Sequence, residues 1–181
     1  MNTTLTSIHA IKSLLLFAVA CVAMTTASAQ ELKLPALSPG CKIKQDFNIS
    51  QIELNYSRPS MRGRIIFGGL VPYDQVWRTG ANAATTVTFG LDVKIAGTPV
   101  KAGTYSFYTV PGRTEWEIIL NKNTGNWGAF GYDKADDVVR TKVPVKLLAL
   151  PVETFTMSVN NLAFSTCTID LNWEKTHVSV P

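Results

Sequence analysis

Arginine and aromatic side chains are concentrated between residues 56 and 89, and they are the side chains of this sequence best suited to bind a ligand. A guanidinium group stays charged and donates paired hydrogen bonds, which suits a carboxylate, sulfate or phosphate. Flat aromatic rings beside asparagine suit a sugar ring, because stacking supplies contact area and polar groups orient it. Glycines and prolines interrupt the stretch and indicate loops, where binding groups usually lie. The candidates are Arg58, Arg62, Arg64, Tyr73, Trp77, Arg78 and Asn82.

A second glycine-rich stretch adds two aromatic candidates for the same ligand, Trp127 and Tyr132. A structural interpretation explains the same residue types. Arginines on a solvated strand face pair with carboxylates such as Glu53 or Asp74. Aromatic side chains near turns close the open end of a sandwich. The sequence leaves the binding and the structural interpretations open.

Catalytic arrangements are less well marked. His177 is the one histidine after residue 29, and no Gly-x-Ser-x-Gly turn accompanies it, so a Ser-His-Asp triad has no identifiable partners. Glu115 and Glu117 lie two apart on one expected strand, about 6.6 Å by strand rise. Paired-carboxylate glycosidases use separations of about 5 to 9.5 Å. Every such pair on every strand has this spacing, so the two glutamates are better read as the solvent side of a hairpin.

Metal and cofactor motifs are sparse. One histidine and two inward-facing cysteines without ligand spacing argue against zinc, and no cofactor is expected. Three carboxylates in one loop are weak candidates for calcium, with an acidic surface turn as the alternative. They are Asp133, Asp136 and Asp137.

The elements that must position these residues are strands. Apolar residues alternate with polar ones, a period of two, in the segments 49–56, 86–91, 155–159 and 164–173. Segments 104–110 and 115–121 flank Pro111-Gly112-Arg113-Thr114 and predict a hairpin. A further strand is expected over 137–145. Short strands with frequent turns and no helical period predict an all-β, antiparallel β-sandwich, with a jelly-roll topology as one option.

The first 29 residues have the features of a signal peptide. Lys12 precedes an apolar run over 14–24, and Ala27-Ser28-Ala29 forms a small-x-small cleavage site, so we expect the exported chain to begin at Gln30. A lipoprotein anchored through Cys21 is the alternative. The run is shorter than the roughly 20 residues that a membrane span needs. Residues 30–40 are expected to be an extension, and residues 41–181 a single β-sandwich domain in the periplasm or outside the cell.

Charge and cysteine content fit export. The chain carries 17 basic and 13 acidic residues, and without Lys12 the net charge is 16 − 13 = +3. This mild excess without a lysine-rich tract argues against a nucleic-acid partner. Cys41 and Cys167 both fall on the apolar parity of an expected strand. They either pair in a disulfide, as an oxidising compartment permits, or remain two unpaired buried thiols.

Several short motifs occur together over nearly the whole chain after residue 29. They are Tyr56-Ser57-Arg58-Pro59-Ser60, Gly63-Arg64, Ile66-Phe67-Gly68, Leu70-Val71-Pro72-Tyr73, Val76-Trp77-Arg78-Thr79-Gly80-Ala81-Asn82, Ala102-Gly103-Thr104-Tyr105-Ser106, Trp127-Gly128-Ala129-Phe130-Gly131-Tyr132-Asp133 and Val178-Ser179-Val180-Pro181. Together they resemble the bacterial family catalogued as domain of unknown function 2911. The resemblance implies an exported protein of a kind common in the Bacteroidetes and brings no activity with it. An acidic residue often follows Gly-Ala-Asn in that family, whereas Ala83 stands here.

Three functions fit this sequence. The leading one is an exported β-sandwich that binds a glycan or an anionic small molecule through its arginine and aromatic loops. An extracytoplasmic hydrolase or lyase is the first alternative, although nothing singles out its base or nucleophile. A structural accessory domain that binds a protein partner in the cell envelope is the second.

Overall fold

The computed structural model describes residues 34–181 of the chain. These residues contain nine β-strands and one short 3-10 helix, joined by turns and loops. The expected signal peptide, with Cys21, lies outside the described residues. Residues Ala36–Pro181 form one unit, and everything below concerns this unit. No helical segment within residues 34–181 has the length and hydropathy needed to span a bilayer.

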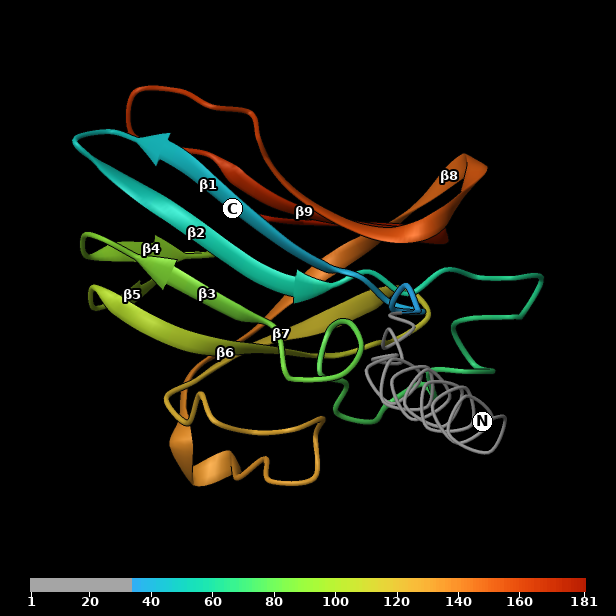
Figure 1. The fold of residues 1–181 in the computed structure, drawn as a ribbon. Helices are drawn as coiled ribbons and strands as arrows, with labels where there is room; N and C mark the ends of the chain where they lie inside the picture. Colours follow the sequence, from blue (N-terminus) through green and yellow to red (C-terminus); the bar gives the residue numbers. More distant parts are fainter. Residues whose placement is uncertain (1–33) are drawn as a thin grey trace, which may run out of the picture. The chain divides into compact units, whose positions relative to one another are not determined.

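Seven antiparallel strands form the main sheet, and two more form a separate ribbon (Figure 1). The prediction of an all-β, antiparallel sandwich is confirmed. In the main sheet, each strand pairs with the next one along the chain, apart from the ribbon inserted between β3 and β6. This topology is a meander, and it differs from the Greek keys of the jelly roll that the sequence offered as an option. The main sheet has the order β1 (Gly40–Phe47), β2 (Ser50–Ser57), β3 (Thr86–Phe89), β6 (Gly103–Val110), β7 (Glu115–Asn121), β8 (Asp137–Asn160) and β9 (Thr168–Val180), and the ribbon pairs β4 (Val93–Ile95) with β5 (Thr98–Val100).

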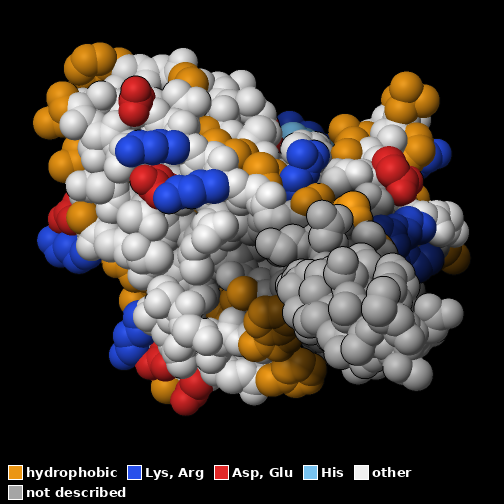
Figure 2. Space-filling view, in the orientation of Figure 1, with side chains coloured by type: hydrophobic (Ala, Val, Ile, Leu, Met, Phe, Trp, Pro, Cys, Tyr) orange, Lys and Arg blue, Asp and Glu red, His pale blue; other side chains and the backbone are white. Residues whose placement is uncertain are grey.

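Successive side chains of a strand point alternately to the core and to the solvent, and β2 is an example. Ile52, Leu54 and Tyr56 are buried. Glu53, between them, faces outward and pairs with Lys42 at 2.9 Å. Figure 2 shows acidic and basic side chains side by side over β1 and β2. One face of this part of the sheet therefore packs inward and the other is solvated.

The strand β9 bends back sharply at Glu174, where φ is 53°. Ser179 donates to the Asp170 carboxylate at 2.6 Å, although nine residues of straight strand would span about 30 Å. His177 and Asn172 approach to 2.8 Å in the same way. The sequence predicted separate strands over 137–145 and 155–159, but β8 is one strand of 24 residues. Its first part pairs with β7 and its second part with β9, so it continues the main sheet from β7 to β9.

An aromatic cluster lies in the core of the domain. Trp77 stacks on Trp173 with ring centroids 5.9 Å apart. Phe67 lies edge-on to Trp116 at 4.9 Å. Phe155 of β8 packs against Trp77 at 5.3 Å. Such pairs add about 0.5–1.5 kcal/mol each beyond the area that they bury. The 58–85 loops are therefore anchored in the core through Trp77.

The two cysteines of the domain are free thiols, so the disulfide considered above is not formed. Cys41 is paired across from Tyr56 near the start of β1. Cys167 lines a cavity together with Phe47, the last residue of β1. Cys41 and Phe47 are about 20 Å apart along the strand, whereas a disulfide needs Cα atoms within about 7 Å.

Candidate functional site

Three of the four arginines in the 56–89 stretch donate hydrogen bonds to neighbouring backbone. Arg58 donates from Nε to the Phe155 carbonyl at 3.2 Å and from Nη2 to Thr156 Oγ1 at 2.9 Å. Arg62 donates from Nη2 to the Leu37 carbonyl at 3.1 Å. These contacts fasten the loop after β2 to β8 and to the chain before β1.

Arg64 also has partners inside its own loop. Its Nε donates to the Met61 carbonyl at 2.9 Å, and its Nη2 donates to the Ser60 carbonyl at 2.7 Å. Its side chain nevertheless lines a cavity of about 490 Å³. Three more of the expected ligand-binding residues line the same cavity, namely Trp77, Arg78 and Asn82.

Arg78 differs from the other three arginines. Its side chain is half-buried, and its Nε has no hydrogen-bond partner within residues 34–181. Burial lowers the pKa of the guanidinium, because leaving water disfavours the charged form. None of the ion pairs in the described part of the chain involves Arg78. The cavity wall thus holds a positive charge without an ion-pair partner, and its Nε, shielded from solvent, has no acceptor within residues 34–181.

Asn82 connects this wall to the loop that follows β7. It adopts a positive φ of 61° and donates from Nδ2 to the Ser38 carbonyl and to Ser57 Oγ, both at 3.3 Å. Its own carbonyl accepts the Gly128 N–H at 3.1 Å. Ala83 and Trp127 form a β-bridge beside it. The 122–133 loop therefore lies directly against the Arg78–Asn82 segment.

Two aromatic side chains of that loop are exposed. Trp127 is 67% exposed and Phe130 is 94% exposed. A Cβ placed on Gly128 would lie 3.2 Å from the Phe130 ring and 3.8 Å from Arg78 Nη1. Because glycine has no side chain, the Phe130 ring and the Arg78 guanidinium can both approach the backbone at Gly128. Figure 2 shows hydrophobic side chains gathered over this loop, low in the view. We call Arg78, Asn82, Trp127 and Phe130 the Arg78 site.

Sequence reasoning missed Phe130. The signal was present, because Phe130 lies in the same aromatic and glycine motif as Trp127 and Tyr132. Alternation and hydrophobicity alone, however, predict that a phenylalanine is buried. Only the folded loop shows that this ring faces water.

The remaining aromatic candidates have internal partners. Trp77 is only 7% exposed, belongs to the core, and donates from Nε1 to the Gly80 carbonyl at 3.2 Å. Tyr73 lies under the guanidinium of Arg113, 4.6 Å from its ring centroid. The Tyr132 hydroxyl donates to Asp137 at 2.7 Å, and burial raises its pKa to about 12.

The acidic loop does not gather into a calcium site. Asp133 accepts the Ala135 N–H at 2.9 Å and caps the short helix Lys134–Asp136. Asp136 pairs with Lys122 at 3.3 Å. Asp137 accepts from Asn121 at 2.9 Å as well as from Tyr132. Within residues 34–181 no group of three or more potential metal ligands lies together.

Side chains considered for catalysis also have structural partners. Glu115 pairs with Lys142, and Glu117 pairs with Arg140. His177 contacts Asn172, whereas the neighbouring Ser179 hydroxyl donates to Asp170. A triad requires the serine to bond to the histidine. The contacts around His177 therefore do not form a triad.

The comparisons with known proteins give one family. The family model described as "Protein of unknown function (DUF2911)" matches residues 38–181. No curated protein and no solved structure matches the chain.

Proposed function

The chain belongs to the DUF2911 family, which confirms the resemblance seen in its motifs, and we propose that it is an exported protein that binds an anionic ligand at the Arg78 site. The ligand has a carboxylate or sulfate group and a flat, partly apolar face, as an acidic or sulfated sugar has. The observation that carries this proposal is the half-buried guanidinium of Arg78 at the cavity wall, which has no ion-pair partner within residues 34–181.

The energetics of Arg78 favour an anionic partner. A buried donor without an acceptor costs about 1–3 kcal/mol, and more when the group is charged. An anion in the cavity would supply the opposite charge and would accept hydrogen bonds from the guanidinium. Charge-assisted hydrogen bonds of this kind are roughly twice as strong as neutral ones. Binding the anion would therefore offset the cost of holding an unpaired, half-buried charge in the free protein.

The exposed rings supply the second part of the recognition. Phe130 lies near Arg78, and Trp127 is exposed on the segment that bridges to Ala83, although neither lines the cavity. A sugar ring that stacks on these rings at the edge of the cavity would reach the guanidinium with its acidic substituent. Large exposed aromatic side chains bury much area at little cost in conformational entropy. Asn82 offers an amide at the same edge, although its Nδ2 already donates to Ser38 and Ser57.

Isothermal titration calorimetry tests the proposal. The probes are tetragalacturonate, a sulfated chondroitin tetrasaccharide and the neutral cellotetraose. We expect an acidic probe to bind and cellotetraose not to bind. Arg78→Gln should weaken the binding at least tenfold, about 1.4 kcal/mol. The matched control is Arg113→Gln, because Arg113 contacts Tyr73 and does not line the cavity.

The opposite results would reject the proposal. Equal binding of neutral and acidic probes would show that charge is not recognised. An affinity unchanged by Arg78→Gln would place the ligand elsewhere. Conversion of a probe to a shorter product, seen by mass spectrometry during the titration, would identify an enzyme and not a binding protein.

A further inference from the structure

A second cavity, of about 720 Å³, opens at the other end of the β1–β2 hairpin. Ser50, at the start of β2, lines it, whereas Ser57, at the end of β2, contacts Asn82 of the Arg78 site. Seven residues of strand separate these serines, about 23 Å. The second cavity is therefore distinct from the Arg78 site. Its volume is within the range of about 300–1,000 Å³ that small-molecule sites occupy.

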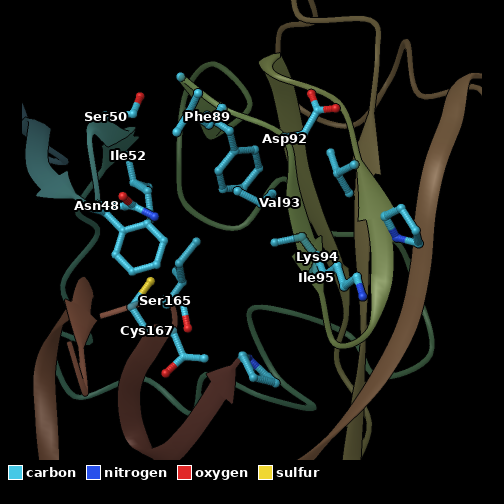
Figure 3. A pocket seen from close by; sticks show the side chains of 18 of the residues that line it. Asn48, Ser50, Ile52, Phe89, Asp92, Val93, Lys94, Ile95, Ser165 and Cys167 are labelled. Carbon is cyan, nitrogen blue, oxygen red and sulfur yellow. The ribbon is translucent and has the colours of Figure 1, made fainter. Parts of the chain in front are cut away.

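The lining of this cavity is mostly apolar and comes from β1, β2, β3 and β9 and from the β4–β5 ribbon. Figure 3 shows Phe89 projecting toward the middle, with Ile52 and Val93 nearby and Cys167 on the opposite side. No buried side-chain nitrogen or oxygen without a partner lines it in the described part of the chain. Most of the lining residues are apolar, and the polar ones include Ser50, Gln51, Ser165 and Thr166.

Three charged side chains line this cavity, Asp92, Lys94 and Lys101, and two of them pair with each other. Asp92 accepts from Lys101 Nζ at 2.8 Å and from the Ala102 N–H at 2.9 Å. Water inside a cavity needs two to four polar partners, and the apolar part of the lining supplies none. Displacing such water by an apolar group is favourable.

Exposed apolar side chains flank the opening. Ile49 is 88% exposed, between the lining residues Asn48 and Ser50. Phe164 is 90% exposed, next to the lining residue Ser165. Clusters of exposed apolar side chains mark interaction sites in soluble domains. An apolar rim around a mostly apolar interior suits a molecule with a large apolar part, which dissolves poorly in water.

We propose that this cavity binds the aliphatic chain of a single-chain amphiphile, such as a fatty acid or a lysolipid, with its polar head at the rim. The chain supplies the affinity, because the interior is apolar and the Asp92–Lys101 charges are already paired. A flexible chain also adapts to an irregular cavity between the main sheet and the β4–β5 ribbon, which a rigid ring system does not.

Calorimetry with a chain-length series tests this directly. Octanoate, decanoate and laurate are titrated below their micellar concentrations, together with butyrate. Each added methylene should strengthen binding about fourfold until the cavity is full, which is the factor for about 0.8 kcal/mol per buried CH₂. Lauroyl lysophosphatidylcholine is the second arm, and whichever arm binds more tightly identifies the source of the chain. Failure of both to bind, or affinity that does not change with chain length, would overturn the proposal.

A variant that fills the cavity locates the binding. Val93 is half-buried and lines the cavity, so Val93→Phe should weaken laurate binding at least tenfold. Val138→Phe is the matched control, because Val138 is on β8 and does not line the cavity. Equal laurate affinities in the two variants, with melting temperatures that show both to be folded, would contradict the assignment.

Protection of Cys167 gives a readout that does not depend on the Val93 variant folding. In a protein with Cys21→Ser and Cys41→Ser, Cys167 is the single thiol. Saturating laurate should slow its modification by N-ethylmaleimide at least fivefold, whereas butyrate should not. An unchanged rate with bound laurate would place the chain outside this cavity.

Discussion

At the scale of single residues, the candidate site depends on which groups already have partners. The sequence marks Arg58, Arg62, Arg64 and Arg78 by the same chemistry, and nothing in their spacing separates them. The structure separates them, because the first three donate to backbone carbonyls and Arg78 does not. Those carbonyls belong to residues 3 to 97 positions away. The sequence therefore showed which residues are arginines, but it could not show which arginine lacks a hydrogen-bond partner.

Replacement of two arginines should separate a structural role from a binding role. Arg58→Gln removes hydrogen bonds to Phe155 and Thr156, so we expect the free energy of unfolding to fall by about 1–3 kcal/mol. Arg78→Gln removes a charge without a partner, so stability should be unchanged or slightly higher. Urea denaturation followed by tryptophan fluorescence measures both. If Arg78→Gln were the more destabilising variant, Arg78 would be a structural residue.

Because the pKa of Tyr56 is raised in the folded protein, we expect the protein to lose stability in alkaline solution. Burial raises its pKa to about 12, although a hydrogen bond from the Met157 N–H opposes the shift. The folded protein therefore holds this proton between pH 10 and 12 while the unfolded chain releases it. The contribution to stability is complete below pH 10 and is lost as the pH rises toward 12.

Tyr56→Phe tests this contribution. The variant loses the hydroxyl contacts with Met157, so at pH 7 it should be less stable by about 1–2 kcal/mol. Above pH 10 its stability should fall less steeply than that of the unaltered protein. Denaturant melts at half-unit intervals from pH 8 to 11.5 give the two slopes. Parallel slopes would show that Tyr56 does not titrate in this range.

At the scale of elements, local patterns predicted some strands well and others poorly. The hairpin of β6 and β7 was predicted nearly to the residue, because alternation and the turn at 111–114 are local signals. The continuous strand β8 was predicted as two pieces. Its continuity comes from pairing first with β7 and then with β9, which is distant in sequence. The bend in β9 has no glycine or proline to mark it.

The bend at Glu174 is open to a stability test. A residue other than glycine pays about 1–2 kcal/mol for the left-handed conformation that Glu174 adopts. Glu174→Gly should therefore raise the free energy of unfolding by up to about 1 kcal/mol, and Glu174→Val should lower it, because β-branched residues fit this conformation worst. Thermal and urea melts measure both. The reverse order would show that the Glu174 carboxylate, which accepts the Phe67 N–H at 3.4 Å, matters more than the backbone.

At the scale of the whole molecule, the sandwich carries two cavities of different chemistry at the two ends of β2. The sequence pointed to the Arg78 end, because arginine and tryptophan are rare enough to stand out. It did not point to the apolar end, because Ile, Val and Phe lining a cavity look the same in sequence as those in a core. Binding at the two ends should be measurable separately, since each can be blocked by its own variant.

Export is a further proposal about the whole chain. In a bacterial host that exports proteins, we expect the mature protein in the periplasm or medium, with Gln30 as its first residue. Intact mass and N-terminal sequencing of each cell fraction check this. A lipid-modified Cys21 would support the anchored alternative, and an intact Met1 in the cytoplasm would contradict export.

The most direct test of the central claim is the thermal unfolding of the unaltered protein and of Arg78→Gln with tetragalacturonate and with the chondroitin tetrasaccharide. A ligand at 100 times its dissociation constant adds about 2.7 kcal/mol, which raises the melting temperature by several degrees in a domain of this size. We predict such a rise for at least one acidic probe in the unaltered protein and none in Arg78→Gln. An equal rise in both proteins, or no rise with either probe, would contradict an anion site at Arg78.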